Sequence, residues 1–313
     1  MNISIVIPNF NGEEILKKNL PKVLEAIKEY GLRNVEVIIA DDCSSDKSIN
    51  LVNEFIEKNN DNRMIIKLLT SERNQGFSSN VNKGAKAATG NIIVLLNTDV
   101  IPSKNFLTPL LDHFKDRQVF GVGCMDESVE NGKIVLRGRG VGRWEKGILV
   151  HSAGNLNKND TLWVAGGSGA FRKEIWDKLG GLDEIYSPFY WEDIDISYRA
   201  LKSGYKCVFE KNSVVRHEHE KGAIRSKYSQ ADIRKIAYTN QFIFVWKNAD
   251  VGLLVSHVLW LPYHLSKGLL GDRLLIIGFL KALLKINKVL DSRMQARKQF
   301  KLSDKQVIQA IET

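Results

Sequence analysis

Residues 92–99 read Ile92-Ile93-Val94-Leu95-Leu96-Asn97-Thr98-Asp99. Five large apolar residues in a row are typical of a short strand that is buried on both faces of a sheet. The strand ends in a polar triplet with a carboxylate, and open α/β sheets bind their ligands at the carboxyl ends of their strands. The stretch therefore predicts a ligand for a metal or a phosphate at the end of a buried strand.

The sequence before this strand alternates between apolar runs and helical patterns. We expect strands over residues 3–7, 35–40 and 64–69, and helices over residues 13–30, about 44–59 and 78–88. This order predicts parallel strands, right-handed crossovers and helices on both faces of the sheet. The predicted fold class is therefore α/β, with a Rossmann-like, mostly parallel sheet.

The sequence after this strand is more mixed. We expect a helix over residues 102–116, short strands and loops over 119–165, a helix over 193–203 and a strand over 206–215. The run Ala165–Ala170 contains only small residues, so the backbone there can approach a ligand closely. Gly167 and Ser168 are the candidates in this run. Tight packing against a helix is the alternative interpretation.

The charge of the chain is concentrated in its last hundred residues. Residues 1–213 hold 28 Lys/Arg and 28 Asp/Glu, whereas residues 214–313 hold 17 and 8, which accounts for the net charge of +9. Apolar runs with Trp246, Trp260 and Tyr263 lie in this basic region, and none reaches the roughly 20 residues that span a bilayer. We expect an amphipathic helical region over 226–313 that binds an anionic membrane surface. A helical subdomain or a homodimer interface is the alternative.

Cysteine usage and the first residues indicate a cytoplasmic chain. Cys43, Cys124 and Cys207 are scattered and odd in number, which favours reduced thiols. The chain begins with residues that form the first predicted strand, and no basic leader precedes them.

Two common nucleotide-binding motifs are missing. The segment after the first strand, Asn9-Phe10-Asn11-Gly12, is not G-x-G-x-x-G, and the chain contains no Walker A motif. Hydride transfer and P-loop NTPase chemistry are therefore not supported. Several carboxylates at the strand ends favour instead a divalent metal that neutralises a diphosphate.

The ordered set of motifs resembles the family 2 glycosyltransferases, which have the GT-A fold. The resemblance covers about residues 1–225 and rests on the segments Ser4–Asn11, Ile39–Asp46, Arg73–Phe77, Leu95–Asp99, Gly180–Asp183, Trp191–Asp195 with Tyr198–Ala200, and His217. It implies a catalytic domain over 1–225, with a nucleotide-binding half over about 1–100 and an acceptor half over about 101–225. The C-terminal region over 226–313 is matched with less specificity.

The resemblance implies a donor site at the strand ends. Its nucleotide-sugar-binding residues are Pro8, Phe10, Asn11, Asp41, Arg73, Asn74, Asn97, Thr98 and Asp99. Asp41 matches a position that accepts a hydrogen bond from a pyrimidine base, which implies a UDP- or dTDP-linked sugar.

A divalent cation, Mn²⁺ or Mg²⁺, is the implied cofactor. Asn97-Thr98-Asp99 matches the Asp-x-Asp motif, so Asp99 would bind the metal. Asn97 departs from the pattern because an amide brings no charge. His217 matches a histidine that completes the metal site, and His219 is the fallback.

Asp193 is the candidate general base, because an acceptor hydroxyl must lose its proton as the new bond forms. Glu192 is the second catalytic candidate, and it and Asp195 are expected to orient the acceptor or to cap the helix. Capping alone is the structural alternative for Glu192 and Asp193. Trp191, with Gly167 and Ser168, is expected on the acceptor side, and a core position is the alternative for Trp191.

The predicted function is that of an inverting, metal-dependent glycosyltransferase. It would act at the inner face of the cell membrane on a glycan or lipid-linked acceptor, in the synthesis of a cell-surface polysaccharide. A non-catalytic nucleotide-sugar-binding or assembly subunit is the alternative, motivated by Asn97. Nucleic acid is not an expected partner, because the basic residues are interleaved with aliphatic runs.

Overall fold

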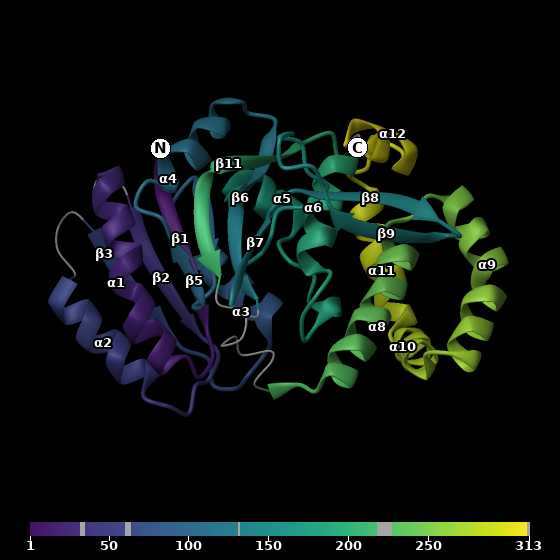
Figure 1. Cartoon of the computed structure of the whole chain (residues 1–313), viewed down its shortest axis with the longest axis horizontal. Helices are drawn as coiled ribbons and strands as arrows, with labels where there is room; N and C mark the ends of the chain where they lie inside the picture. Colours follow the sequence, from purple (N-terminus) through teal and green to yellow (C-terminus); the bar gives the residue numbers. More distant parts are fainter. Residues whose placement is uncertain (32–34, 60–63, 131, 218–226, 312–313) are drawn as a thin grey trace.

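The computed structural model describes residues 1–31, 35–59, 64–130, 132–217 and 227–311. A nine-stranded sheet runs through the molecule in the order β3-β2-β1-β4-β10-β6-β11-β5, with β7 paired to β6. Helices α1 and α2 lie at one end of the molecule and the C-terminal helices lie at the other (Figure 1). The prediction of an α/β fold with a C-terminal helical segment is confirmed.

The first half of the chain follows the predicted alternation of strands and helices. Its elements are β1 (Ile3–Asn9), α1 (Glu13–Tyr30), β2 (Val35–Asp41), α2 (Ser48–Asn59), β3 (Met64–Leu69), α3 (Phe77–Ala87) and β4 (Ile92–Leu96). The strands pair in parallel, β1 with β2 and β4, and β2 with β3. This arrangement places the segments after β1, β2 and β4 at the same edge of the sheet.

The strands are buried on both faces, and alternate residues pack into two separate cores. Val6, Ile38 and Ile93 belong to one hydrophobic cluster. Their neighbours Ile5 and Val37 belong to the other. The period of two that a strand imposes therefore explains why these strands consist of almost unbroken apolar runs.

The second half of the chain extends the same sheet with mixed pairing. Its elements are β5 (Val100–Pro102), α4 (Leu107–Asp112), β6 (Val119–Glu130), β7 (Lys133–Arg137), β8 (Gly140–Glu145), β9 (Ile148–Ala153), β10 (Ser168–Arg172), α5 (Lys173–Leu179), α6 (Glu192–Lys202) and β11 (Lys206–His217). Strand β10 is antiparallel to both β4 and β6. Strand β11 is parallel to β6 and antiparallel to β5. Strands β8 and β9 form a separate hairpin.

The helix predicted over residues 102–116 is wrong in its extent. Only Leu107–Asp112 is α-helical, followed by a 3₁₀ turn over His113–Lys115. Residues Val100–Pro102 form β5 instead, because they pair with residues 215–217 of β11. Such a long-range pairing leaves no local signal in the sequence.

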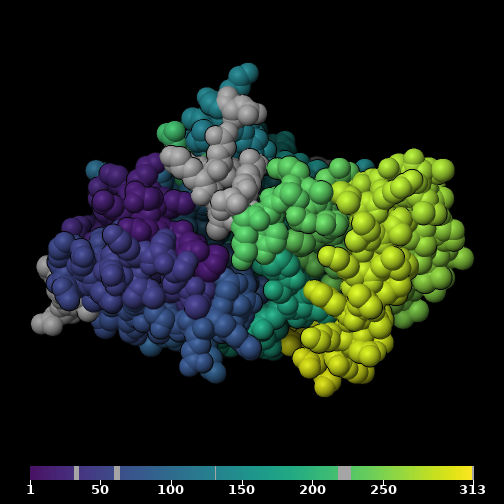
Figure 2. Space-filling view, turned by 90° about the horizontal axis from the view of Figure 1, so that it is seen from below, coloured from purple at the N-terminus to yellow at the C-terminus, as the bar shows by residue number. Residues whose placement is uncertain are grey.

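The described part of the C-terminal region, residues 227–311, contains five α-helices that pack on each other and on α6. They are α8 (Gln230–Asn248), α9 (Val251–Leu270), α10 (Arg273–Leu283), α11 (Ile286–Arg297) and α12 (Asp304–Ala310). Figure 2 shows these helices, in green to yellow, beside the teal middle of the chain. Within the described ranges, every helix is too short or too polar to cross a bilayer.

Candidate active site

The segments after β1 and β2 form one connected turn structure. Asp41 is 1% exposed and accepts hydrogen bonds from Asn9 Nδ2 (2.7 Å), the Ser44 amide (2.9 Å) and the Ser44 hydroxyl (2.6 Å). The Ser44 hydroxyl also accepts from the Asn11 amide (2.8 Å). Asp41 therefore fixes the turn that carries Asn11, and its role toward a base stays a prediction.

Asp42 anchors the loop that carries two predicted donor-site residues. Its carboxylate accepts from the amides of Gln75 (2.9 Å) and Gly76 (2.8 Å). Arg73 and Asn74 lie just before these amides and are exposed. Asp42 was not among the site residues predicted from the sequence, although it adjoins Asp41. The buried Asp42 carboxylate holds the loop in place, and its two exposed side chains stay available to a ligand.

The other two predicted residues of the nucleotide half differ in exposure. Pro8 is buried within β1 opposite Ala40 of β2. Phe10 is partly exposed, and the Lys227 ammonium lies 4.9 Å from its ring centroid. Phe10 is thus the side chain of this pair that a ligand can reach.

The end of β4 is joined to the small-residue run. The Asn97 amide donates to the Gly167 carbonyl (2.9 Å), and the Thr98 carbonyl accepts from Asn19 Nδ2 (2.7 Å). A Cβ on Gly167 would lie 2.5 Å from Asn97 Nδ2, so any larger residue there would displace the Asn97 side chain. Within the described part of the chain, the buried Asn97 Oδ1 has no hydrogen-bond partner. An unpaired buried acceptor is costly, so this atom is suited to a bound ligand.

Asp99 and His217 meet although they lie far apart in the sequence. His217 Nε2 is 3.3 Å from Asp99 Oδ2, and His217 Nδ1 is 3.1 Å from Asp126 Oδ2. Burial alone would lower the pKa of His217, but hydrogen bonds with Asp126 and Asp99 outweigh it and raise the pKa to about 9. The fallback His219 lies outside the described residues.

Asp126 is a candidate site residue that sequence reasoning missed. It lies on β6, where it pairs with Val215 of the parallel strand β11. A carboxylate on one imidazole nitrogen fixes the tautomer and the direction of the other nitrogen, as in many metal sites. Only the register of β6 with β11 reveals this partner.

Glu192 and Asp193 begin α6 after a strained turn. Tyr190 and Trp191 both adopt left-handed backbone conformations, with φ of 71° and 77°. Consecutive left-handed residues other than glycine are rare, and such strain is concentrated at functional sites. The turn places two adjacent carboxylates at a helix N-terminus.

Asp193 faces the small-residue run. Its Oδ2 accepts from the Gly166 amide (3.4 Å) and its Oδ1 from the Ile194 amide (2.8 Å). Burial raises the pKa of Asp193 above its usual value of 3.8, and the backbone hydrogen bonds oppose this in part. Asp193 is therefore a stronger base than an ordinary aspartate.

Glu192 is 6% exposed, and its Oε2 finds no partner in the ranges that the structure covers. Burial, and then the charge of Asp193, raises the pKa of Glu192 well above 4.5. Asp195, expected to orient the acceptor or cap the helix, is instead fully buried in an ion pair with Arg199 (2.7 Å).

The remaining acceptor-side candidates are buried. Trp191 is 5% exposed, with its ring 5.1 Å from those of His151 and Phe244. This position favours the core alternative for Trp191. Ser168 is 3% exposed and begins β10. The backbone of residues 166–167 lies between the two parts of the site, because the Gly167 carbonyl accepts from the Asn97 amide and the Gly166 amide donates to Asp193.

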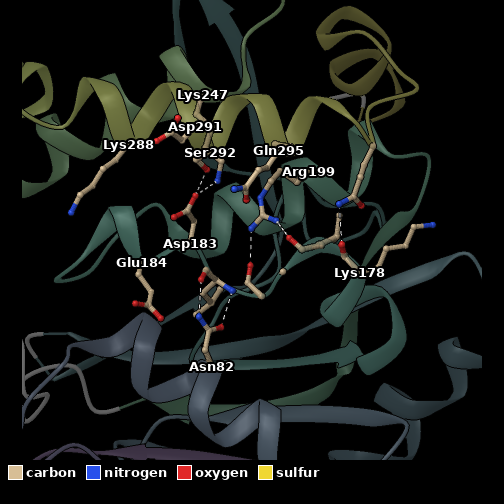
Figure 3. Close-up of a pocket in the computed structure, with 16 residues that line it drawn as sticks. Asn82, Lys178, Asp183, Glu184, Arg199, Lys247, Lys288, Asp291, Ser292 and Gln295 are labelled. Carbon is tan, nitrogen blue, oxygen red and sulfur yellow. Dashed lines mark hydrogen bonds and ion pairs between the residues drawn. The ribbon is translucent and has the colours of Figure 1, made fainter.

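A separate cavity of about 530 Å³ lies between α6, α3 and α11. Its lining includes Asn82, Asp183, Arg199, Ser292 and Gln295 (Figure 3). It contains none of the predicted site residues, and Arg199 in its wall is already paired with Asp195. We therefore place the candidate active site at the strand ends and not in this cavity.

The family model for glycosyl transferase family 2 matches residues 4–180, so the chain belongs to this family. The O-antigen chain rhamnosyltransferase RfbN of Salmonella typhimurium is 24% identical over 223 residues, which is 70% of this chain and 67% of that protein. The probable glycosyltransferase YdaM of Bacillus subtilis is 25% identical over 213 residues, 66% of this chain and 48% of that protein.

Solved structures show the same fold. GalNAc-T7 with UDP, GalNAc and Mn²⁺ has a TM-score of 0.63 at 20% identity, over 79% of this chain and 48% of that chain. TarS 1–349 of S. aureus with UDP-GlcNAc has a TM-score of 0.60 at 16% identity, over 100% and 90%. The chain is therefore a glycosyltransferase with the GT-A fold, as its sequence predicted.

Proposed function

We propose that this chain is an inverting, metal-dependent glycosyltransferase. It transfers a sugar from a nucleoside diphosphate donor to a hydroxyl of a glycan or lipid-linked acceptor. One observation carries the proposal: residues 166–167 contact Asn97 on one side and Asp193 on the other. A carboxylate with a raised pKa thus lies beside the strand end that carries Asp99.

Asp193 is the proposed general base. It takes the proton from the acceptor hydroxyl while the oxygen attacks the anomeric carbon, and the bond to the nucleoside diphosphate breaks. A single in-line displacement of this kind inverts the anomeric configuration. The Gly166 and Ile194 amides hold the carboxylate in one orientation. Glu192, buried beside Asp193, is proposed to favour the protonated form more than an exposed glutamate does, because burial and then the charge of Asp193 raise its pKa.

The residues at the end of β4 fit a divalent cation. Asp99 and the unpaired Asn97 Oδ1 offer oxygen there, and His217, at the end of β11, would offer nitrogen once it loses the proton that Asp126 and Asp99 favour. Across the described residues, His, Cys, Asp and Glu form no group of three that could hold a metal alone. Mn²⁺ and Mg²⁺ often take only one or two protein ligands, with phosphate oxygens and water completing the shell. When bound, the cation would neutralise the leaving diphosphate.

The proposed donor is a UDP- or dTDP-linked sugar, held by the donor-site residues that the sequence predicted. The exposed Arg73 and Asn74 and the reachable Phe10 support this assignment. GalNAc-T7 was solved with UDP and Mn²⁺, and the mannosyltransferase PcManGT from Pyrobaculum calidifontis with GDP-Man and Mn²⁺. The rhamnosyltransferase RfbN acts on an O-antigen chain, which supports a role in the synthesis of a cell-surface polysaccharide.

A panel of nucleotide sugars tests this function. We expect nucleoside diphosphate release from one UDP- or dTDP-linked sugar with Mn²⁺ or Mg²⁺, and loss of release on chelation. Asp99→Ala is expected to raise the metal concentration needed for half-maximal rate by at least tenfold. Release that persists in excess chelator would refute the metal dependence.

Asn97 supports a second candidate, a subunit that binds a nucleotide sugar without transferring it. An amide in place of a carboxylate lowers the negative charge available to a cation. Donor binding without release, across metals and acceptors, would favour this candidate.

We further propose that residues 226–313 bind an anionic membrane at the cytoplasmic face. Helix α9 buries His257 and His264 against the β8–β9 turn, and its Val258, Leu259 and Leu270 are 65%, 74% and 91% exposed. The apolar face of α9 is therefore directed outward. The exposed Lys267 on α9 and the exposed Arg273 and Lys281 on the neighbouring helix α10 add positive charge to these two helices, which favours an anionic lipid surface over a second copy of this basic chain.

A further inference from the structure

Helix α8 presents one face to α6 and to the turn before it. Asn240, Phe244, Lys247 and Asn248 are spaced i, i+4, i+7 and i+8, so they share this face. All four are at most 1% exposed. Helix α8 of the C-terminal region is therefore in direct contact with α6, the helix that begins with Glu192 and Asp193.

Asn240 donates hydrogen bonds to three carbonyls of the turn that precedes Glu192. Its Nδ2 donates to the carbonyl oxygens of Tyr186 (2.7 Å), Phe189 (2.9 Å) and Tyr190 (2.9 Å). An amide group has two hydrogens, so one of them is shared between two carbonyls. A single side chain thus holds three points of one turn.

The same turn contains the two strained residues. Tyr190, whose carbonyl Asn240 binds, and Trp191 adopt the left-handed conformation. The Trp191 ring packs on Phe244 of α8, with ring centroids 5.1 Å apart. Strained backbone persists only where its surroundings hold it, and here α8 supplies both the hydrogen bonds and the packing.

Helix α8 also contacts α6 at Asp195, two residues after Asp193. Asp195 accepts from Lys247 Nζ (2.8 Å) and Asn248 Nδ2 (2.8 Å), in addition to Arg199 and Tyr186. Lys247 binds Asp183 as well, at 2.7 Å, and Figure 3 shows these side chains directed toward each other. The segment that contains Glu192 and Asp193 is thus held on both sides by one helix.

We infer that this face of α8 is a positioning element for the general base, with Asn240 as its central residue. It acts through the turn and α6, which its side chains contact. The inference rests on the proposed function for the role of Asp193. It extends the catalytic unit beyond residue 225 to the end of α8.

The test compares Asn240→Ala with Phe242→Leu. Phe242 lies on the opposite side of α8, against Trp246, His257 and Phe279, so its variant reports a general loss of helix packing. We expect Asn240→Ala to lower kcat by about 10²-fold, since small misplacements of a catalytic group have effects of this size. The donor Kd is expected to stay within about twofold, and Phe242→Leu is expected to change kcat no more than that.

Hydrogen exchange gives a readout that does not need activity. Asn240→Ala should speed exchange of the amides over residues 186–193, and Phe242→Leu should not. Equal kcat in the two variants, a donor Kd that weakens as much as kcat falls, or unchanged exchange would each overturn the inference. Should the parent protein transfer no sugar, the proposed function fails, and the exchange data alone still decide whether Asn240 holds the turn. Asn248→Ala, which removes one of four bonds to Asp195, replaces Asn240→Ala if that variant does not fold.

Discussion

A methyl group at position 167 would collide with Asn97. A Cβ there would lie 2.5 Å from Asn97 Nδ2 and 2.9 Å from Asn97 Cγ. We expect Gly167→Ala to displace the Asn97 side chain and to raise the donor KM by about tenfold, because Asn97 and Asp99 share the end of β4. Steady-state kinetics at saturating metal measure this change. Gly252→Ala, whose Cβ has open space, is the control, and an unchanged donor KM in Gly167→Ala would count against the donor-side role of Asn97.

The raised pKa of Asp193 predicts an acid limb in the pH profile. A general base must be ionised, so the rate falls as the pH drops through its pKa. Because burial raises this pKa above 3.8, kcat is expected to decline at a higher pH than for an exposed aspartate. A profile of kcat against pH measures this decline, and donor binding measured over the same pH range is the control. A rate that stays flat down to pH 4 would contradict the assignment.

Asp126 and Asn240 mark the limit of what the sequence predicted at the residue scale. Asp193, Asp99 and His217 could be proposed as site residues because each matches a position in the ordered set of motifs. Asp126 reaches His217 only through the register of β6 with β11. Asn240 lies in the region over 226–313 that was expected to bind a membrane surface. Their partners are 91 residues and about 50 residues away in the chain. Local patterns carry no information on such contacts.

At the scale of elements, β2 carries a buried charge at the edge opposite the active site. Glu36 accepts from Ser4 Oγ (2.5 Å), the Thr89 amide (2.6 Å) and Lys67 Nζ (2.8 Å). Burial alone would raise the pKa of Glu36, but these hydrogen bonds lower it from 4.5 to about 2. The group thus ties β1 and β3 to β2 and the end of α3 to the sheet.

Glu36→Gln is expected to reduce the free energy of unfolding by about 3 kcal/mol at pH 7. A depressed pKa in the folded state gives stability that is present above pH 4.5 and is lost as the pH falls through 2. The difference between variant and parent should therefore shrink between pH 4.5 and pH 2. Urea denaturation across this range measures it. A difference that does not change with pH would show that the charge of Glu36 is not the source.

Secondary structure was predictable where a local pattern decides it. Strand β3 and strand β4 have the predicted ends, and α1 follows the predicted helix. The helix over 102–116 was predicted too long at its start, because Pro102 and Ser103 bond to β11, and the antiparallel insertion of β10 between β4 and β6 was not foreseen. The small residues of 165–170 partly allow β10 to fit between its neighbours, since Gly169 of β10 lies against Val164 with no room for a Cβ.

At the scale of the molecule, helix α9 lies at the end away from β3 (Figure 1). We expect the protein to sediment with vesicles that contain anionic lipid and not with neutral ones. Leu259→Glu with Leu270→Glu should lower this binding by at least tenfold, since two exposed leucines are lost and negative charge is gained.

Ile65→Glu, at an exposed position on β3, is the control for added charge. Vesicle binding that survives the double substitution would refute the membrane surface. A dimer in solution that the same double substitution dissociates would instead assign this face to a second copy of the chain.

Asp193 is proposed to be the general base of the sugar transfer. The most direct measurement compares the parent protein with Asp193→Asn for nucleoside diphosphate release and for donor binding, with the best donor and Mn²⁺. Asparagine keeps the shape and cannot take a proton, so we predict release at least 10²-fold slower and a donor Kd within about twofold. An Asp193→Asn protein that transfers sugar at the parent rate would contradict the account.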